Sequence, residues 1–281
     1  MAADLHCHTR HSDGSATVEE VILFAKGNGV STLAITDHDT VSGWEEAARY
    51  GERYGMTVIP GIELSGYDYK RGQKAHILCY FCPRPERLAA LCRKIANDRR
   101  QATEQMIQTL LGRYPITKEM IVRRAGEGRS IYKQHILHTL MDAGYTKEIF
   151  GSLYQTLFDH QEGLAHIEIP YPDVYQVLET IGESGGVAVM AHPGECKKEG
   201  LLEELAASGL LDGVEIWHPK NSPEKRPEFQ AIARQHGLIM TGGTDFHGMY
   251  SSRCDPVGSY TTPEDQLQAL YRRKEEKQGA Y

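Results

Sequence analysis

The sequence predicts an α/β protein built on a mainly parallel sheet or barrel, with a helical region inserted into it. Three observations indicate this fold class. Strand-like and helical segments alternate in both outer parts of the chain, the middle is mostly helical, and a His, Asp or Glu residue ends or closely follows nearly every expected strand. Alternating strands and helices are typical of parallel sheets and barrels, not of sandwiches.

The first part of the chain begins this alternation. Its strands are expected at residues 2–8, 32–36, 56–64 and 75–81. One helix is expected after Thr17, where Glu20 completes a capping box, and a second one over residues 42–54. The polar segment 70–74 is typical of a hairpin turn between the last two strands.

The alternation returns after residue 185. Strands are expected at residues 186–191, 213–217 and 238–241, and helices at 201–208 and 223–236. The charged run 272–277 near the C-terminus is interpreted as a solvated surface.

The middle of the chain has a different pattern. From residue 84 to 171 apolar residues recur at helical spacing, for example Met106 and Leu110 on one stripe. We therefore predict that residues 1–83 and 172–281 form the body and that residues 84–171 form an inserted helical cap.

Composition narrows the classes of protein. A chain of 281 residues suffices for one large domain or for one domain with an insertion. No apolar run approaches the ~20 residues of a membrane span, and the N-terminus lacks a secretory pattern, so we expect a cytoplasmic protein. A net charge of −7 argues against a surface that coats nucleic acid. Six irregularly spaced cysteines are expected to be reduced thiols.

Metal-capable side chains gather at the expected strand ends. His6 and His8 are two residues apart on a strand, so both imidazoles face the same side. The other strand ends supply His11, Asp13, Asp37, His38, Asp39, Glu63, His76, His192, Asp245 and His247. Imidazole and carboxylate ligands together suit zinc, manganese or iron. Because these ligands exceed what one ion can use, we expect two or three divalent metal ions.

For each of these residues taken singly, the alternative is an ordinary role as a hydrogen-bonded surface or core residue that binds no metal. It is weak for six strand ends that all finish in His, Asp or Glu, and there we favour the metal cluster. For His160, His166 and His236, which follow no strand, the ordinary role is preferred. His218 follows a strand but stands alone there, and it is also interpreted as ordinary. Cys79 and Cys82 form a single CxxC on a strand and are interpreted as structural.

These strand-end residues also lie in a series of motifs. The segments are DLHCHTRHSDG at 4–14, AITDHDT at 34–40, GIELS at 61–65, AHP at 191–193 and GTDFH at 243–247. In this order they resemble the motifs of the PHP (polymerase and histidinol phosphatase) family over nearly the whole chain. Within that family the chain is most similar to stand-alone phosphoesterases with a helical insertion, including nucleoside 3′,5′-bisphosphate phosphatases. Related members trim RNA or short oligonucleotides from the 5′ end.

The resemblance implies a distorted (β/α)7 barrel with a trinuclear metal site. It assigns His6, His8, Glu63 and Asp245 to a first metal. Glu63, His76 and His192 would hold a second metal, and Asp13, His38 and His247 a third. Asp37 and Asp39 are expected to orient ligands. His11 is either a further ligand or a proton donor to the leaving group, and both alternatives stay open.

The resemblance also implies the reaction. We expect a metal-activated hydroxide to attack a phosphate monoester, with Asp13, His38 and His11 as catalytic residues. Lys133 and His135 of the cap, with Arg253, are predicted to bind substrate. Relatives often have Arg at the position of Lys133, and lysine keeps the charge but not the bidentate fork.

The expected substrate is a small nucleotide, first of all the 3′ phosphate of a nucleoside 3′,5′-bisphosphate. Two related activities are alternatives: histidinol-phosphate phosphatase and 5′-3′ exonuclease on RNA or short oligonucleotides. A metal-binding accessory module without turnover is a third alternative, which we rank lowest because every expected ligand position is filled. No membrane and no obligate protein partner are expected.

Overall fold

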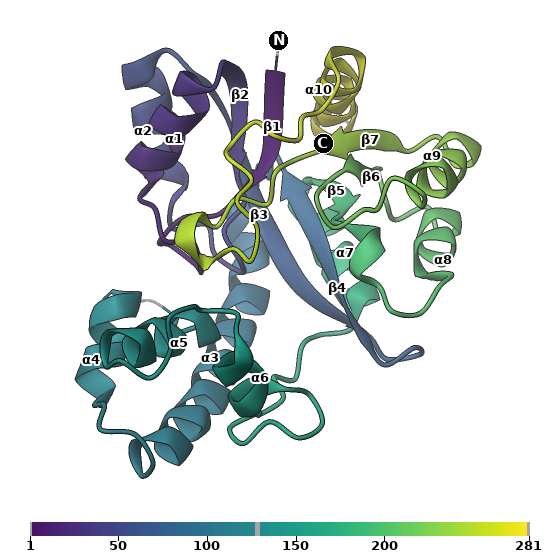
Figure 1. The fold of residues 1–281 in the computed structure, drawn as a ribbon. Helices are drawn as coiled ribbons and strands as arrows, with labels where there is room; N and C mark the ends of the chain where they lie inside the picture. The colour runs from purple at the N-terminus through teal and green to yellow at the C-terminus, as the bar shows by residue number, and fades with distance from the viewer. Residues whose placement is uncertain (1, 127–129, 280–281) are drawn as a thin grey trace.

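A seven-stranded sheet forms the centre of the protein in the computed structural model, which describes residues 2–126 and 130–279 (Figure 1). The strands are β1 (Ala2–Cys7), β2 (Val30–Ile35), β3 (Thr57–Asp68), β4 (Gln73–Tyr80), β5 (Val187–Met190), β6 (Gly213–Trp217) and β7 (Ile239–Gly242). They lie side by side in chain order, and only β4 runs antiparallel to its neighbours. The α/β class with a mainly parallel sheet is therefore confirmed, as is the hairpin that joins β3 to β4.

A closed barrel is not confirmed. The strand ladder runs from β1 to β7 as an open sheet. In the described part of the chain the two ends of the sheet meet through a parallel bridge between Cys7 and Phe246, which follows β7. Backbone hydrogen bonds from Asp245 to His6 and from His8 to Phe246 support this contact. β1 and the segment after β7 are thus held next to each other without forming a full ladder.

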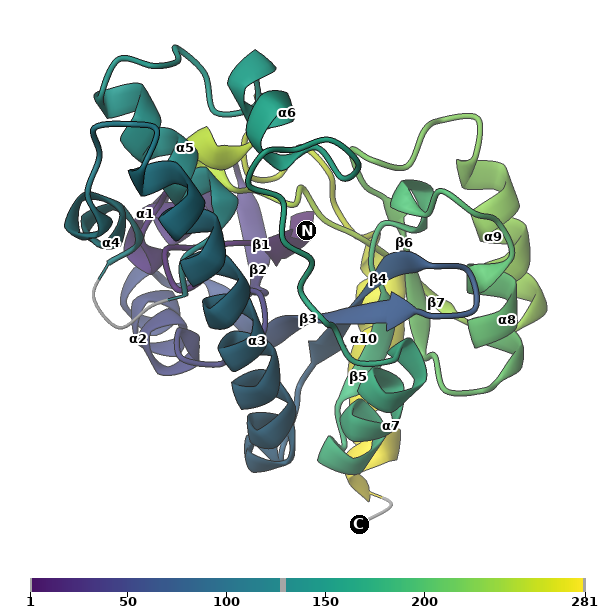
Figure 2. The ribbon, with the colours of Figure 1, turned by 90° about the horizontal axis from the view of Figure 1, so that it is seen from below.

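The helices of the body pack around the sheet (Figures 1 and 2). They are α1 (Val18–Gly27), α2 (Trp44–Tyr54), α7 (Val174–Ser184), α8 (Leu201–Ala207), α9 (Arg226–Gln235) and α10 (Glu264–Gly279), with short 3-10 turns η1 (Pro193–Glu195) and η2 (Gly248–Tyr250). The capping box of Thr17 and Glu20 begins α1 as predicted. The charged run near the C-terminus is not only solvated, because Arg273 and Lys277 of α10 pair with Asp212.

The middle of the chain is helical, as predicted. It contains α3 (Pro85–Leu111), α4 (Lys118–Ala125), α5 (Lys133–Asp142) and α6 (Ser152–Phe158), which gather below the sheet in Figure 1. The early turns of α3 pack into the core of the sheet through Leu88 and Ile95. Its later turns join a separate apolar core that contains Met106, Leu110 and residues of the other three helices.

The helices α3 to α6 thus supply most of a second core, to which η2 contributes Tyr250, and α3 connects this core to the sheet. In Figure 2 the β3–β4 hairpin lies with α3 on one side and with α8 and α9 on the other. No helix of the described residues has both the length and the apolar character needed to cross a membrane.

Candidate metal centre and substrate cavity

The predicted metal ligands come together in one place. Glu63 and His76 lie within β3 and β4 and not at strand ends as expected, because β3 continues to Asp68 in its antiparallel pairing with β4. In each of three overlapping groups, the ligand atoms lie within 4.8 Å of one another. The groups are His6, His8, Glu63 and Asp245; His8, Asp13, His38 and His247; and His38, Glu63 and His76. We call these residues, together with His192, the strand-end cluster. Its members come from positions up to 241 residues apart in the sequence (from 6 to 247), so only the folded sheet creates it.

Glu63 lies at the centre of the strand-end cluster. Its Oε1 is 3.0 Å from both His76 Nδ1 and His192 Nε2. Its Oε2 lies 3.2 to 3.3 Å from nitrogens of His6, His8 and His38. One carboxylate therefore faces five imidazoles at the centre of the candidate ligands.

The strand-end cluster has the donors and the charge that divalent cations need. Within the described part of the chain, the Nδ1 atoms of His8 and His38 are buried and make no hydrogen bond. Buried polar atoms are rarely left without a partner, so these nitrogens fit metal ligation. Burial lowers the pKa of His38 to about 3 and keeps its imidazole neutral. Burial opposes ionisation of Glu63 and Asp13, but the surrounding histidines hold both pKa values well below the usual range.

Strained backbone accompanies the strand-end cluster. Asp39, His192 and Asp245 have φ values of 56°, 25° and 54°, in the left-handed region that non-glycine residues rarely adopt. Such conformations cost about 1–3 kcal/mol each and persist where the surrounding structure enforces them. Gly243 shows one source of this constraint, since a Cβ there would lie 2.3 Å from His6 Cβ.

Buried carboxylates orient the ligands from behind. Glu215 of β6 places Oε1 3.0 Å from His6 Nδ1, and its Oε2 accepts a hydrogen bond from the backbone of His192. His6 Nε2 is thereby turned toward Glu63 and the rest of the cluster. Asp37 accepts hydrogen bonds from Thr9 and Ser12, which order the loop that carries Asp13.

Sequence reasoning missed several of these neighbours. It gave no role to Glu215 and interpreted His218 as ordinary, yet His218 is buried with Nε2 3.4 Å from Asp245 Oδ2. The available signal was its place directly after β6, like the other strand-end residues. Lys220 was also missed, although its Nζ lies 3.1 Å from Asp245 Oδ2 and 2.9 Å from Glu195 Oε1.

The three predicted catalytic residues are placed differently. Asp13 and His38 lie in the strand-end cluster. His11 does not share their contacts: its Nδ1 is 2.9 Å from Ser42 Oγ and its Nε2 is 2.8 Å from Glu46 Oε2. The role of His11 as ligand or proton donor stays a prediction.

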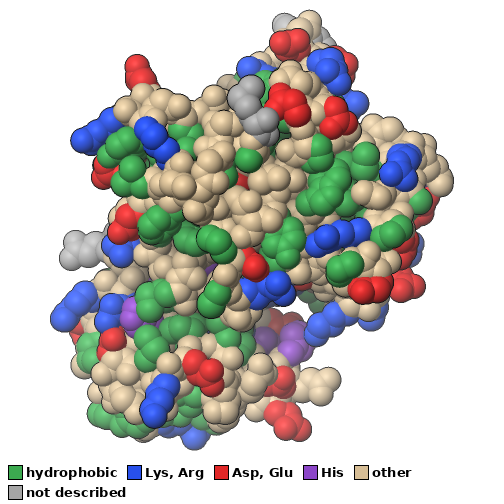
Figure 3. All heavy atoms as spheres, turned by 45° about the horizontal axis from the view of Figure 1, so that its top comes forward, with side chains coloured by type: hydrophobic (Ala, Val, Ile, Leu, Met, Phe, Trp, Pro, Cys, Tyr) green, Lys and Arg blue, Asp and Glu red, His purple; other side chains and the backbone are tan. Residues whose placement is uncertain are grey.

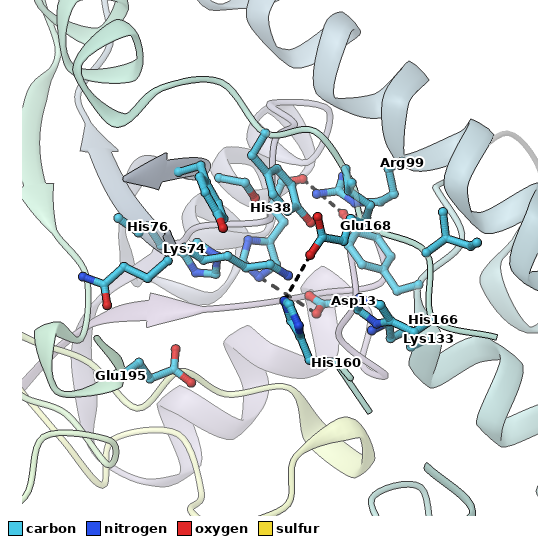
Figure 4. A pocket seen from close by; sticks show the side chains of 18 of the residues that line it. Asp13, His38, Lys74, His76, Arg99, Lys133, His160, His166, Glu168 and Glu195 are labelled. Atoms are coloured by element: carbon cyan, nitrogen blue, oxygen red, sulfur yellow. Dashed lines mark hydrogen bonds and ion pairs between the residues drawn. The ribbon is translucent and has the colours of Figure 1, made fainter. Parts of the chain in front are cut away.

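A cavity of about 630 Å³ opens beside the strand-end cluster (Figure 4). Asp13, His38 and His76 line one part of it, and Lys74 of β4 and Lys133 of α5 line another. Neither lysine has a carboxylate partner among the described residues. Burial, with a smaller contribution from Lys74, lowers the pKa of Lys133 to about 8. Figure 3 shows histidine and basic side chains at the surface where the helical region meets the body.

The helical region touches the strand-end cluster directly. Gln134 Nε2 donates a hydrogen bond to Asp13 Oδ2 at 3.0 Å. Arg99 of α3 is buried, pairs with Asp39 at 2.5 Å and lies over the ring of Tyr132. Sequence reasoning did not single out Arg99, because nothing in a helical pattern marks one arginine as buried.

The other two predicted substrate-binding residues differ in exposure. His135 is buried, and its Nδ1 accepts a hydrogen bond from the backbone of Tyr132 at the start of α5. Arg253 is exposed and pairs with Asp255. It lines a second hollow of about 320 Å³, which shares Asp13 and His38 with the larger cavity. Substrate binding by Lys133, His135 and Arg253 stays a prediction.

Comparison with known proteins identifies the relatives of this arrangement. The model of the PHP domain family matches residues 4–184. The chain is similar to a crystal structure described as a metal-dependent phosphoesterase from Bifidobacterium adolescentis, with a TM-score of 0.88 and 30% identity over 96% of this chain and 95% of the other.

The chain is also similar to relatives named for three different activities. A phosphoribosyl 1,2-cyclic phosphate 1,2-diphosphodiesterase of Eggerthella lenta is 36% identical over 89% of this chain and 95% of the relative. The 5′-3′ exoribonuclease Rnm of Escherichia coli is 30% identical over 87% and 84%. A 3′,5′-nucleoside bisphosphate phosphatase of Chromobacterium violaceum is 29% identical over 87% and 86%.

Proposed function

This chain belongs to the PHP domain family and is a metal-dependent phosphoesterase, and from this premise we propose that it hydrolyses one ester of a ribose that carries two phosphoryl groups. The observation that carries the proposal is the position of Lys74 and Lys133. Both line the cavity beside the strand-end cluster without a carboxylate partner among the described residues. One phosphoryl group at the cluster and a second one at these lysines would use both parts of the cavity.

The first candidate substrate is a nucleoside 3′,5′-bisphosphate that loses its 3′ phosphate. The cavity accommodates more than a phosphate group, and Tyr132, Tyr154 and Tyr171 line it with rings that a base or sugar can contact. The second candidate is a cyclic phosphodiester of phosphoribose, because the relative with that activity is 36% identical over most of both chains. Both candidates share the ribose with two phosphoryl groups.

We propose that two or three divalent ions, manganese, iron or zinc, occupy the strand-end cluster. His6, His8, Glu63 and Asp245 would hold the first, Glu63, His76 and His192 the second, and Asp13, His38 and His247 the third. Ions bound in this way would neutralise charge on the phosphate oxygens and lower the pKa of a bound water.

The residues of the chain position the reactants around that centre. Glu215 fixes the ring of His6, and Gln134 fixes the carboxylate of Asp13. Asp13 and His38 line the cavity and therefore face the ester that is to be cleaved. Lys133 holds the phosphoryl group that is not cleaved, so the scissile group is oriented for in-line attack.

We further propose the division into a body of residues 1–83 and 172–281 and a cap of residues 84–171, and a barrel-like curvature of the sheet. The separate apolar core of α3 to α6 supports the cap. The contact between Cys7 and Phe246 supports the curvature, since it joins the two ends of the sheet.

The experiment that tests the proposed function is hydrolysis with added Mn²⁺ of a set of substrates, with the products separated and identified by chromatography, because cleavage of a phosphodiester releases no free phosphate. The set contains adenosine 3′,5′-bisphosphate, phosphoribosyl 1,2-cyclic phosphate, histidinol phosphate, a short 5′-phosphorylated RNA and p-nitrophenyl phosphate. We expect the highest kcat/KM for one of the first two. Preference for RNA or for histidinol phosphate would contradict the proposal.

The role of Lys133 is tested in the same assay. Lys133→Ala should lower kcat/KM for the preferred substrate about 10- to 100-fold, because a hydrogen bond to a charged group contributes about 1.5–3 kcal/mol. Hydrolysis of p-nitrophenyl phosphate, which has no second phosphoryl group, should change little. Lys118→Ala is the matched control, since Lys118 pairs with Glu104 on the outside of the cap. Equal losses on both substrates would contradict a role in holding the second group.

A further inference from the structure

A second group of metal-capable side chains lies in the segment after α6, outside the strand-end cluster. His160, His166 and Glu168 each place one ligand atom within 4.8 Å of the others. His160 Nε2 is 3.2 Å from Glu168 Oε1, and the ring centroids of the two histidines are 5.0 Å apart. The sequence gave both histidines an ordinary role because no strand precedes them.

His166 lacks the partners that a buried imidazole normally has. Both of its ring nitrogens are buried, and neither makes a hydrogen bond within the described residues. Such atoms are costly to leave unpaired, which indicates a missing ligand. Burial lowers the pKa of His166, and the nearby charges of Lys133 and His160 lower it further. A lowered pKa favours the neutral ring, which is the form that binds metal ions.

The backbone holds this segment in a defined conformation. Asp159 Oδ1 accepts hydrogen bonds from the backbone of Gln161 and Glu162. The backbone N–H of Ala165 donates to Leu157 of α6, and that of His166 donates to Gly163. The three ligand side chains are thus presented from an ordered turn fixed to the end of a helix.

The chemistry of these three side chains determines which kind of ion they can bind. A carboxylate next to two imidazoles that carry free nitrogen lone pairs repels phosphate and attracts a cation. Two His and one Glu are a ligand set typical of zinc, whereas calcium and magnesium prefer oxygen ligands alone. We propose that His160, His166 and Glu168 bind a transition-metal ion of the zinc class, at a site separate from the strand-end cluster.

The site faces the substrate cavity. His160, His166 and Glu168 all line it, and Figure 4 shows His160 and Glu168 pointing toward each other there. The side chains of His160 and Glu168 are 67% and 70% exposed, so coordination positions stay open to water or to a substrate oxygen. An ion at this site adds a positive charge to the part of the cavity that contains Lys133. Its effect on substrate binding rests on the proposed function, but its presence does not.

The test is the number of zinc ions bound per chain at saturation, measured by equilibrium dialysis and elemental analysis. The full-length protein is compared with a His160→Ala/Glu168→Gln double variant and with His166→Gln. Each variant should bind one zinc ion fewer than the wild type, because the strand-end cluster is unchanged. His236→Ala is the matched control: it removes a histidine that pairs with Glu203 at 2.8 Å, and it should bind as much zinc as the wild type.

Equal zinc content in the wild type and in both variants would overturn the proposal. A circular dichroism spectrum and a melting curve establish that the variants are folded; substitution of two exposed side chains in the double variant leaves the apolar core intact. Zinc binding is counted without turnover, so failure of the proposed substrate would not affect this result. If the zinc site is present but KM for the preferred substrate is the same in wild type and variants, the ion does not contact the substrate.

Discussion

The strand-end cluster and the part of the cavity wall that the helical region forms both contain histidine and glutamate side chains. These side chains differ in burial. In the cluster, side chains such as His6, His8 and Glu63 are almost completely buried and each has several partners within the sheet. In the cavity wall, His160 and Glu168 are mostly exposed. Under the proposed function, the buried residues of the strand-end cluster perform the chemistry, while the helical region presents groups that select the substrate.

A physical reason underlies this division. Ions and phosphate oxygens must be placed within a few tenths of an ångström, and strand ends held by buried carboxylates provide that precision. Substrate must enter and leave, so the residues that contact its remaining part stay accessible. The predictions below separate the two roles, from the largest expected effect to the smallest.

Removal of the central carboxylate should have the largest effect. Glu63→Gln keeps the shape of the side chain but removes the charge that faces five imidazoles. We expect kcat with Mn²⁺ to fall at least about 10⁴-fold, because bound ions contribute several kcal/mol of charge stabilisation. The matched control is Glu86→Gln at the exposed start of α3. Retained turnover in a folded Glu63→Gln protein would show that the site lies elsewhere.

Loss of the ion pair between Arg99 of the helical region and Asp39 of the body should mainly affect stability. Arg99→Met leaves Asp39 buried without its cation, which costs about 3–5 kcal/mol of unfolding free energy for pairs of this kind. Urea denaturation measures the loss. The double variant Asp39→Asn/Arg99→Met should recover part of it, since no unpaired charge remains. A double variant as unstable as the sum of the single ones would indicate that the two residues act independently.

Substitution of Glu215, which contacts His6 but is not itself a predicted ligand, should have a smaller effect on activity. Glu215→Gln weakens the contact with His6 Nδ1 and leaves the ligand in place. Such substitutions typically reduce metal affinity or activity about 10- to 100-fold. The Mn²⁺ concentration at half-maximal activity should rise accordingly. If Mn²⁺ affinity and kcat are both unchanged, the orientation of His6 does not depend on Glu215.

The smallest predicted effect is a pH dependence that originates in the helical region. The pKa of Lys133 is lowered to about 8 by burial and by Lys74, and His166 also lies nearby. The ammonium group is charged below this pH and neutral above it, so substrate binding by Lys133 should weaken as pH rises from 7 to 9. In that range KM for the preferred substrate should increase up to about tenfold.

Lys133→Arg isolates this contribution, because arginine stays charged over the whole range. Its KM should be nearly constant between pH 7 and 9, apart from changes that it shares with the wild type. If the two proteins have the same pH profile, the titrating group is not Lys133.

The sequence predicted the elements of the fold where local signals are strong. The capping box at Thr17 and Glu20, the β3–β4 hairpin and the helical middle segment are all present in the structure. These features depend on neighbouring residues and on periodicity, which the sequence contains directly. The closed barrel is not confirmed, because the pairing of the first and last strands depends on curvature accumulated across the whole sheet.

The sequence by itself also determined which residues converge as candidate ligands. Polar side chains at the ends of parallel strands meet at one edge of a sheet, so His6 and Asp245 were identifiable from their positions. Glu63 converges with them although it lies within β3. Only the tertiary structure decided what surrounds them. Glu215 lies 209 residues from His6, and Arg99 lies 60 residues from Asp39, so no local pattern links the members of either pair. The His160–Glu168 group likewise exists because a turn after α6 folds three side chains together at the cavity, and such contacts depend on packing and not on periodicity.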